Sequence, residues 1–221
     1  MLKIGVDDAG RGPVIGPMIL AGVLINSEQE KELKKLGVKD SKQLTPKRRE
    51  FIAEKIRETI SSYELVIVQP DEIENKQEQG IKLNEVEAIA CAKIINKLNK
   101  EEEKIKVILD CPSTSLIKWK DFLKTKIKDL SNLEILCEHK ADQNHVAVSA
   151  ASILAKSQRE KEMDKLRKKY GNEIGSGYTS DPATQRFLQK YADKYKDDGI
   201  FRKTWITWKK ASENLGQRKL F

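Results

Sequence analysis

The sequence predicts an α/β protein in which helices cover a sheet of mixed strand direction. Two observations support this class. Short apolar runs alternate with longer stretches whose apolar residues recur three and four positions apart. The first two apolar runs have no such stretch between them and read as an antiparallel hairpin, whereas the later ones are separated by helices, which favours parallel pairing.

The expected strands are short and strongly apolar. The first covers Leu2–Val6 and ends at Asp7, and the second, "PMILAGVLI" at 17–25, is apolar enough to be buried on both faces. Three further strands are expected at "YELVIVQ", "KVILD" and "LEILCEH", which are residues 63–69, 106–110 and 133–139.

The expected helices carry recognisable start signals. Ser27 and Glu30 have capping-box spacing before the helix at 27–37, and Thr45 with Pro46 begins another. Further helices are expected at 83–99, 116–130, 145–170, 182–195 and 204–216. Because no strand signal follows Lys165, we expect a sheet domain over residues 1–165 and a C-terminal helical segment over 166–221.

Composition limits the partners and the compartment. The 221 residues include 42 Lys and Arg against 34 Asp and Glu, for a net charge of +8, which favours a polyanion such as nucleic acid. Cys91, Cys111 and Cys137 have no CxxC spacing and are expected to be buried free thiols in a reducing compartment. With no apolar run of membrane-spanning length and no signal peptide, the protein is expected in the cytoplasm.

Four acidic residues are expected at the ends of these elements. Asp7 and Asp8 follow the first strand, Asp110 ends the fourth, and Asp142 lies between the fifth strand and a helix. If the first and fourth strands are neighbours, these carboxylates could converge on Mg²⁺ or Mn²⁺, which prefer oxygen ligands. Taken singly, Asp110 is better interpreted as a turn residue and Asp142 as an N-cap, and the pair Asp7-Asp8 does not decide the question. Only their shared position at the ends of elements favours a metal site.

The segment Gly10-Arg11-Gly12 also has two interpretations. It lacks the GxxxxGK[ST] pattern of a phosphate-binding loop and the glycine spacing of a dinucleotide-binding turn. It could be only a tight turn, or its small residues could let backbone N–H groups approach a phosphate or a sugar.

Five motifs together resemble ribonuclease HII, particularly its archaeal branch. They are "DDAGRGPVIGPM", "GVKDSKQLTPKRR", "EHKAD", "VSAASILAKSQRE" and "GSGYTSDPAT", and the resemblance covers Lys3 to about Trp208. It implies a ribonuclease H-like fold, with the catalytic domain over residues 1–165. It also implies an endonuclease that cleaves RNA in RNA–DNA hybrids and single ribonucleotides in duplex DNA, leaving 3′-hydroxyl and 5′-phosphate ends.

The resemblance assigns roles to individual positions. The catalytic and metal-binding acids fall on Asp7, Asp8, Asp110 and Asp142, which would hold two Mg²⁺ or Mn²⁺ ions, with Asp7 the expected bridging ligand. The substrate-binding glycine loop falls on Gly10, Arg11 and Gly12, and the tyrosine that senses the RNA-to-DNA junction falls on Tyr178. Lys42 and Lys140 lie in the same motifs, and each could contact a phosphate or be a solvated surface lysine.

One position departs from the family pattern. The second acid of the family is glutamate, whereas this chain has Asp8, whose side chain is shorter by one methylene and loses roughly 1.5 Å of reach. The alternative to an active nuclease is therefore a catalytically weakened relative that still binds nucleic acid.

The C-terminus carries a further, weaker signal. Gln217, Leu220 and Phe221 resemble the front of a peptide that binds a sliding clamp, although the second aromatic is missing and a frayed helix end is the better interpretation. The other expectations are a monomer with no membrane partner.

Overall fold

The structure is a computed structural model that describes residues 1–38, 44–60, 62–100 and 103–218. The chain forms two compact units, and each is described by itself. The sheet unit comprises Met1–Ala9, Ile19–Val66 and Leu83–Gln158, and the helical unit comprises Gly10–Met18, Ile67–Lys82 and Arg159–Phe221. Within the described residues, no helix is both long enough and apolar enough to cross a membrane.

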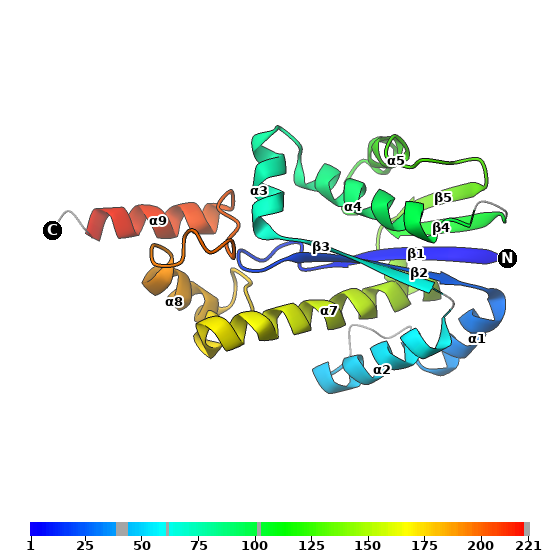
Figure 1. The fold of residues 1–221 in the computed structure, drawn as a ribbon, viewed down its shortest axis with the longest axis horizontal. Helices are drawn as coiled ribbons and strands as arrows, with labels where there is room; N and C mark the ends of the chain where they lie inside the picture. Colours follow the sequence, from blue (N-terminus) through cyan, green and yellow to red (C-terminus); the bar gives the residue numbers. More distant parts are fainter. Residues whose placement is uncertain (39–43, 61, 101–102, 219–221) are drawn as a thin grey trace. The chain divides into compact units, whose positions relative to one another are not determined.

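A five-stranded sheet forms the centre of the sheet unit (Figure 1). Its order is β3-β2-β1-β4-β5. The strands are β1 (Leu2–Ala9), β2 (Met18–Ile25), β3 (Ser62–Val68), β4 (Ile105–Asp110) and β5 (Leu133–Glu138). β1 pairs antiparallel with β2 and parallel with β4, which in turn pairs parallel with β5. The prediction of a mixed sheet is confirmed, and the first and fourth strands meet the stated condition of being neighbours.

Helices cover both faces of this sheet, and two glycines mark where they come closest. The helices of the sheet unit are α1 (Ser27–Lys35), α2 (Pro46–Thr59), α4 (Leu83–Leu98), α5 (Leu116–Lys124), α6 (Ala141–Asn144) and the first part of α7 (Val146–Tyr170). A Cβ on Gly5 would lie 2.2 Å from the carbonyl carbon of Ala147, and a Cβ on Gly22 would lie 2.2 Å from Cγ2 of Ile94. Gly5 therefore faces α7 and Gly22 faces α4, and Figure 1 shows α4 on one side of β1 and β2, with α1 and α2 on the other.

The helical unit has its own apolar core. It contains α3 (Pro70–Glu78), the rest of α7, the short 3₁₀ helix η2 (Asn172–Ile174), α8 (Pro182–Tyr191) and α9 (Ile206–Arg218). Phe201 lies at the centre of this core, with its ring centroid 4.4 Å from that of Trp208 and 6.4 Å from that of Phe187. Ile15 forms an isolated antiparallel bridge with Phe201, so the segment after the glycine loop is buried in this core.

Several predicted boundaries were wrong. β1 continues to Ala9, because its backbone pairing with β2 extends past the acids. The cap of α1 is Asn26, which forms the capping box with Gln29, so Ser27 is already helical. α5 ends at Lys124, six residues before the predicted end.

Helix α3 was not predicted at all. It begins at Pro70, a favoured first position, but its only buried residues are Pro70 and Ile73. A helix with so few buried residues has no apolar periodicity to detect. The division into a catalytic domain over 1–165 and a helical segment over 166–221 stays a prediction, because compactness alone does not assign catalysis.

Candidate active site

Asp7 is a buried acid within β1. Its backbone is paired with Ala21 of β2, and the residue is only 7% exposed. One of its oxygens, Oδ1, accepts a hydrogen bond of 2.8 Å from the backbone N–H of Asp8. Because Asp7 lies two positions after Gly5, it shares the face of the sheet that α7 covers.

Asp8 points to the opposite face of the same strand. Successive side chains alternate across a strand, so Asp8 shares its face with Val6, which is paired with Gly22, and therefore faces α4. Its charge is accordingly felt by Cys91 of α4, whose thiol pKa is raised by burial first and then by the charges of Glu87 and Asp8. The strand pleat directs the two successive carboxylates to opposite faces, although the charge of Asp8 still raises the pKa of Asp7.

Asp110 returns to the face of Asp7. In the parallel register, Gly5 is paired with Ile108, so the residues two positions later, Asp7 and Asp110, lie at matching places on neighbouring strands. Oδ1 of Asp110 accepts a hydrogen bond of 3.1 Å from the backbone N–H of Ala141.

Asp142 is brought to the same side by α6. Ala141, the first residue of that helix, packs against Ile108 of β4 and Val148 of α7. Asp142 follows directly and is 6% exposed. The structure thus places Asp7 and Asp110 on the α7 face, Asp142 in the short helix α6 that packs against β4, and Asp8 on the α4 face, and the convergence of all four on one ion stays a prediction.

The electrostatics of Asp7 report the closeness of these acids. Burial raises the pKa of Asp7 well above its usual value, and the charges of Asp8 and Asp110 raise it further. The nearby Ser152 hydroxyl and the Asp8 N–H favour the ionised form and oppose that rise in pKa. A bound cation would offset both the burial and the repulsion, so the donor set suits a hard divalent ion.

The side chains are not yet arranged as ligands. Among the described residues, no group of three or more Asp, Glu, His or Cys could hold a metal ion as the side chains stand. The position of Asp8 on the face opposite Asp7 accounts for part of this. The acids therefore fit a metal in chemistry, while coordination requires them to turn toward a common point.

Lys140 sets the turn that leads into α6. It is exposed and has φ of 58°, the one positive value at a non-glycine residue in the described stretches. This left-handed turn directs the next N–H, that of Ala141, to Asp110. Lys42 lies outside the described residues, so its expected role stays a prediction.

The glycine loop belongs to the helical unit. Gly10 has φ of +80°, and a Cβ there would lie 2.4 Å from Nε of Arg159 and 2.9 Å from the carbonyl oxygen of Pro17. Only glycine fits this position without displacement. Gly12 is exposed, and a Cβ there would meet no other atom within 4 Å, so its small size is not required by packing.

Tyr178 lies in the same unit and contacts the same arginine. The residue is 40% exposed, and the guanidinium carbon of Arg159 lies 4.8 Å from the centroid of its ring. Nη2 of Arg159 donates to the carbonyl oxygen of Ser176 at 2.9 Å. Arg159 thus packs against both Gly10 and Tyr178, the two parts of the helical unit that the sequence marked for substrate binding.

Further hydrogen bonds tie the Tyr178 loop to the glycine segment. The carbonyl oxygen of Gly177 accepts from the backbone N–H groups of Val14 and Ile15 at 2.9 and 3.2 Å. The N–H of Gly177 donates to Oγ1 of the fully buried Thr184 at 3.0 Å. Hydrogen bonds of the neighbouring Gly177 therefore hold the loop that carries Tyr178, in addition to the contact of the Tyr178 ring with Arg159.

Sequence reasoning missed three residues of these sites. They are Ser152 beside Asp7, Arg159 beside Tyr178, and Arg202, which is fully buried under the glycine loop. Ser152 and Arg159 lie in the motif "VSAASILAKSQRE", so a helical projection of α7 could have drawn attention to them. Arg202 lies in no motif, and its burial has no sequence signal.

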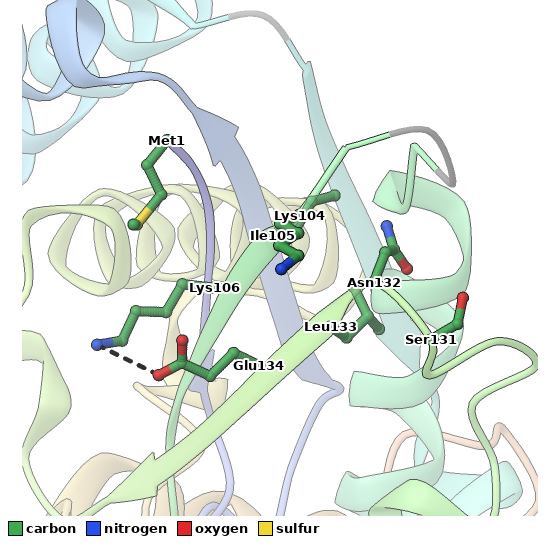
Figure 2. A pocket seen from close by; sticks show the side chains of 8 residues that line it. All are labelled: Met1, Lys104, Ile105, Lys106, Ser131, Asn132, Leu133 and Glu134. Atoms are coloured by element: carbon green, nitrogen blue, oxygen red, sulfur yellow. Dashed lines mark ion pairs between the residues drawn. The ribbon is translucent and has the colours of Figure 1, made fainter.

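A pocket also occurs at the other end of the strands (Figure 2). It has a volume of about 300 Å³, and the amino ends of β4 and β5 line it, including Lys106 and Glu134, whose charged atoms lie 3.7 Å apart. The acids lie at the carboxyl ends of the strands, where sites in parallel sheets form, so we assign this pocket no part in the chemistry.

A mixed five-stranded sheet in this order, with helices on both faces and acids at the ends of neighbouring parallel strands, defines a ribonuclease H-like α/β protein. Comparison with known proteins gives the family. The sequence profile of ribonuclease HII matches residues 4–208, so the chain belongs to the ribonuclease HII family. It is an endoribonuclease that acts on RNA–DNA hybrids.

Several relatives support this assignment. Ribonuclease HII of Methanocaldococcus jannaschii is 43% identical over 230 residues, which cover 100% of this chain and 99% of that protein. The crystal structure of ribonuclease H2 from Pyrococcus horikoshii matches with a TM-score of 0.86 and 38% identity, over 97% of this chain and 98% of that one.

Two further structures contain a second component, which is the protein PCNA in one and Mn²⁺ in the other. The PCNA:RNase HII complex from Archaeoglobus fulgidus matches with a TM-score of 0.81 and 36% identity, over 93% of this chain and 95% of that one. The more distant Bst-RNase HIII in complex with Mn²⁺ has a TM-score of 0.79 and 23% identity, over 96% of this chain and 70% of that one, and shares the fold alone.

Proposed function

We propose that this ribonuclease HII uses Asp7, Asp8, Asp110 and Asp142 to bind Mg²⁺ or Mn²⁺, and that it cleaves at single ribonucleotides in duplex DNA as well as in hybrids. The products would be a 3′-hydroxyl and a 5′-phosphate. The observation that carries the proposal is the matching position of Asp7 and Asp110 on parallel neighbouring strands, with the pKa of Asp7 raised by burial and by adjacent acids.

The metal part of the proposal rests on donor chemistry. Carboxylate oxygens are the ligands that Mg²⁺ and Mn²⁺ prefer, and the related Bst-RNase HIII was crystallised with Mn²⁺. Divalent ions held by these acids would supply an activated water and charge stabilisation at the phosphate. The chain itself orients Asp7 through the Asp8 N–H and Asp110 through the Ala141 N–H.

The substrate part of the proposal rests on the helical unit. Phosphates are alike along every strand, so recognition of one ribonucleotide requires contact with its 2′-hydroxyl. Backbone groups of Gly10, Arg11 and Gly12 would make that contact, since the two glycines carry no side chain. Tyr178 would place its exposed ring against the sugar that follows the ribonucleotide, and Lys140 and Lys42 would contact phosphates.

A cleavage assay tests the metal and the product together. The protein is incubated with a duplex that carries one ribonucleotide, in EDTA and then in Mg²⁺, Mn²⁺ or Ca²⁺. We expect cleavage on the 5′ side of the ribonucleotide in Mg²⁺ or Mn²⁺, poor cleavage in Ca²⁺, and none in EDTA, because Ca²⁺ prefers longer bonds and a looser shell. Full turnover in EDTA would refute the metal proposal.

A matched pair of variants controls the assay. Asp110→Asn should abolish cleavage, whereas Asp121→Asn, an exposed aspartate of α5 in the same unit, should cleave like the parent. If the protein cleaves the hybrid but leaves the single-ribonucleotide duplex intact, the family activity stands and the proposed cleavage at single ribonucleotides is rejected.

We further propose that the C-terminus contacts a sliding clamp. The relative from Archaeoglobus fulgidus was solved as a PCNA:RNase HII complex, and Gln217, Leu220 and Phe221 resemble the front of a clamp-binding peptide. Leu220 and Phe221 lie outside the described residues. Deleting residues 217–221 should remove binding to an archaeal PCNA in gel filtration and leave hybrid cleavage unchanged, and retained binding would refute the proposal.

A further inference from the structure

Arg202 is fully buried in the helical unit and binds three backbone carbonyls between Gly10 and Gly16, a stretch that begins with the glycine loop. Its Nη1 donates to the carbonyl oxygen of Arg11 at 2.6 Å, and its Nη2 donates to those of Gly10 at 2.6 Å and Gly16 at 2.9 Å. Nε adds a bond of 3.2 Å to Gly16. The contact to Gly10 joins residues 192 positions apart in the chain, so it forms only in the folded protein.

Trp205 extends this set by one residue. Its indole Nε1 donates to the carbonyl oxygen of Gly12 at 3.2 Å. Its ring lies against the arginine, with the guanidinium carbon of Arg202 5.1 Å from the ring centroid. The consecutive carbonyls of Gly10, Arg11 and Gly12 are therefore each held by a side chain from the same short segment.

The segment that carries these two side chains, residues 202–205, is itself held by helix α3 and by Val14. The carboxylate of Glu74 accepts a hydrogen bond from the backbone N–H of Lys203, and the Thr204 hydroxyl donates to Oε1 of Gln77 at 2.7 Å. The N–H of Arg202 donates to the carbonyl oxygen of Val14 at 2.9 Å. The backbone that carries Arg202 and Trp205 is therefore fixed by hydrogen bonds to other parts of the helical unit.

The carbonyl contacts determine where the loop's N–H groups point. In a trans peptide, a carbonyl and the N–H of the next residue point in opposite directions. Since the carbonyls of Gly10 and Arg11 point to the guanidinium, the N–H groups of Arg11 and Gly12 point away from it. An apolar side chain could fill the space of Arg202 without the desolvation of a charge, but only the arginine fork can orient several carbonyls at once.

We propose that Arg202 and Trp205 are positioning residues, which orient the backbone of Gly10–Gly12 for contact with the ribonucleotide. The inference rests on the proposed function of that loop. Neither side chain needs to touch the substrate, because each acts through the peptide groups that it holds.

The test compares two conservative variants with two matched controls. Arg202→Lys keeps the charge and loses the fork, and Trp205→Phe keeps the ring and loses the indole N–H. Arg186→Lys changes an exposed arginine of α8 in the same unit. Trp119→Phe loses a comparable indole hydrogen bond, of 2.8 Å to the carbonyl oxygen of Asn84, in the sheet unit.

Two readouts are measured, and the first uses no nucleic acid. Amide hydrogen exchange of Gly16, whose N–H donates to the carbonyl oxygen of Ile200 at 2.9 Å, should accelerate at least about 10-fold in Arg202→Lys and less in Trp205→Phe, and should be unchanged in both controls. The second readout is cleavage of an RNA–DNA hybrid and of a single-ribonucleotide duplex. We expect kcat to fall about 10-fold in Arg202→Lys and about threefold in Trp205→Phe, with KM within about twofold, because small misplacements are costly in the transition state.

The possible results separate this inference from the function on which it rests. Unchanged exchange and unchanged kcat in folded variants would overturn it, as would faster exchange with kcat unchanged on both substrates. If Arg202→Lys does not fold, Trp205→Phe decides by the same criteria. A parent that leaves the single-ribonucleotide duplex intact would reject the proposed substrate, while exchange and hybrid cleavage would still decide whether Arg202 positions the loop.

Discussion

Asp7 and Gly10 are three residues apart in the chain, but the structure fixes them by different means. Asp7 is positioned by regular backbone pairing, in which a strand on each side of β1 determines the register and the face of its side chain. Gly10 follows the end of β1, and its conformation depends on Arg202 and Arg159, which come from much later in the chain.

The two kinds of site should therefore respond differently to substitution. An acid on a central strand has a rigid backbone, so a substitution there changes the chemistry while the fold persists. A loop held by side-chain donors depends on each donor, so a substitution changes both the conformation and its stability. Variants in each region can test that contrast.

Asp7→Asn should reduce cleavage of an RNA–DNA hybrid by at least about 10³-fold, or about 4 kcal/mol of transition-state stabilisation. The amide keeps the shape of the carboxylate and loses its charge, and the strand that carries it should remain folded. Initial rates with excess substrate, together with circular dichroism, measure both effects. Cleavage within tenfold of the parent would mean that Asp7 is not a metal ligand.

Gly10→Ala should lower activity about 10²-fold and also destabilise the fold, whereas Gly12→Ala should leave stability unchanged. A methyl group on Gly10 would clash with Arg159 and Pro17 at a positive φ, but a methyl group on Gly12 would meet nothing within 4 Å. Thermal unfolding of both variants, alongside their cleavage rates, makes the comparison. Equal unfolding temperatures for the two variants would contradict the packing described for Gly10.

Tyr178→Ala should lose about 10-fold more rate on a single-ribonucleotide duplex than on a long hybrid. A flat ring fits a deoxyribose and would crowd a second 2′-hydroxyl, so its loss should matter most at an RNA-to-DNA junction. Tyr178→Phe keeps the ring over Arg159 and is the matched control. An unchanged rate ratio in a folded Tyr178→Ala variant would return this residue to a purely structural role.

Asp8→Glu should accelerate cleavage a few-fold. Asp8 faces α4 while Asp7 faces α7, and an added methylene would lengthen the reach of the Asp8 carboxylate by roughly 1.5 Å, as in the glutamate of the family pattern. The measurement is kcat in Mg²⁺ for the variant and the parent. No gain would show that the aspartate already reaches its place, and it would remove the reason to regard this chain as a weakened relative.

Asp7→Asn should also raise the unfolding temperature at neutral pH in EDTA, by a smaller effect than the loss of activity. Because the pKa of Asp7 is raised in the folded state, ionising it opposes folding, so the parent loses stability as pH rises from the ordinary carboxyl range through that raised pKa. The variant has no such loss. The difference in unfolding temperature between the variant and the parent should therefore shrink on acidification to about pH 3, where Asp7 is protonated in both the folded and the unfolded state. A difference that stays constant across pH would contradict this cause.

Much of the sheet unit could be predicted from the sequence alone. The apolar runs located all five strands, Thr45 and Pro46 marked the start of α2, and the three cysteines are buried and free as expected. Local physics is sufficient here, because strand burial, caps and turns depend on residues that are near one another in the chain. The candidate acids could be singled out for the same reason, since they end apolar runs or follow them.

How those residues are used depends on the tertiary structure. Strand pairing extended β1 through Asp8 and sent the two neighbouring acids to opposite faces, which no local pattern reveals. Helix α3 has too few buried residues to show a period, and Arg202 looks like any surface arginine until its guanidinium is seen under Gly10 and Arg11. The physical reason is the same in each case: these features depend on hydrogen bonds and packing between segments far apart in the sequence, which local preferences do not encode.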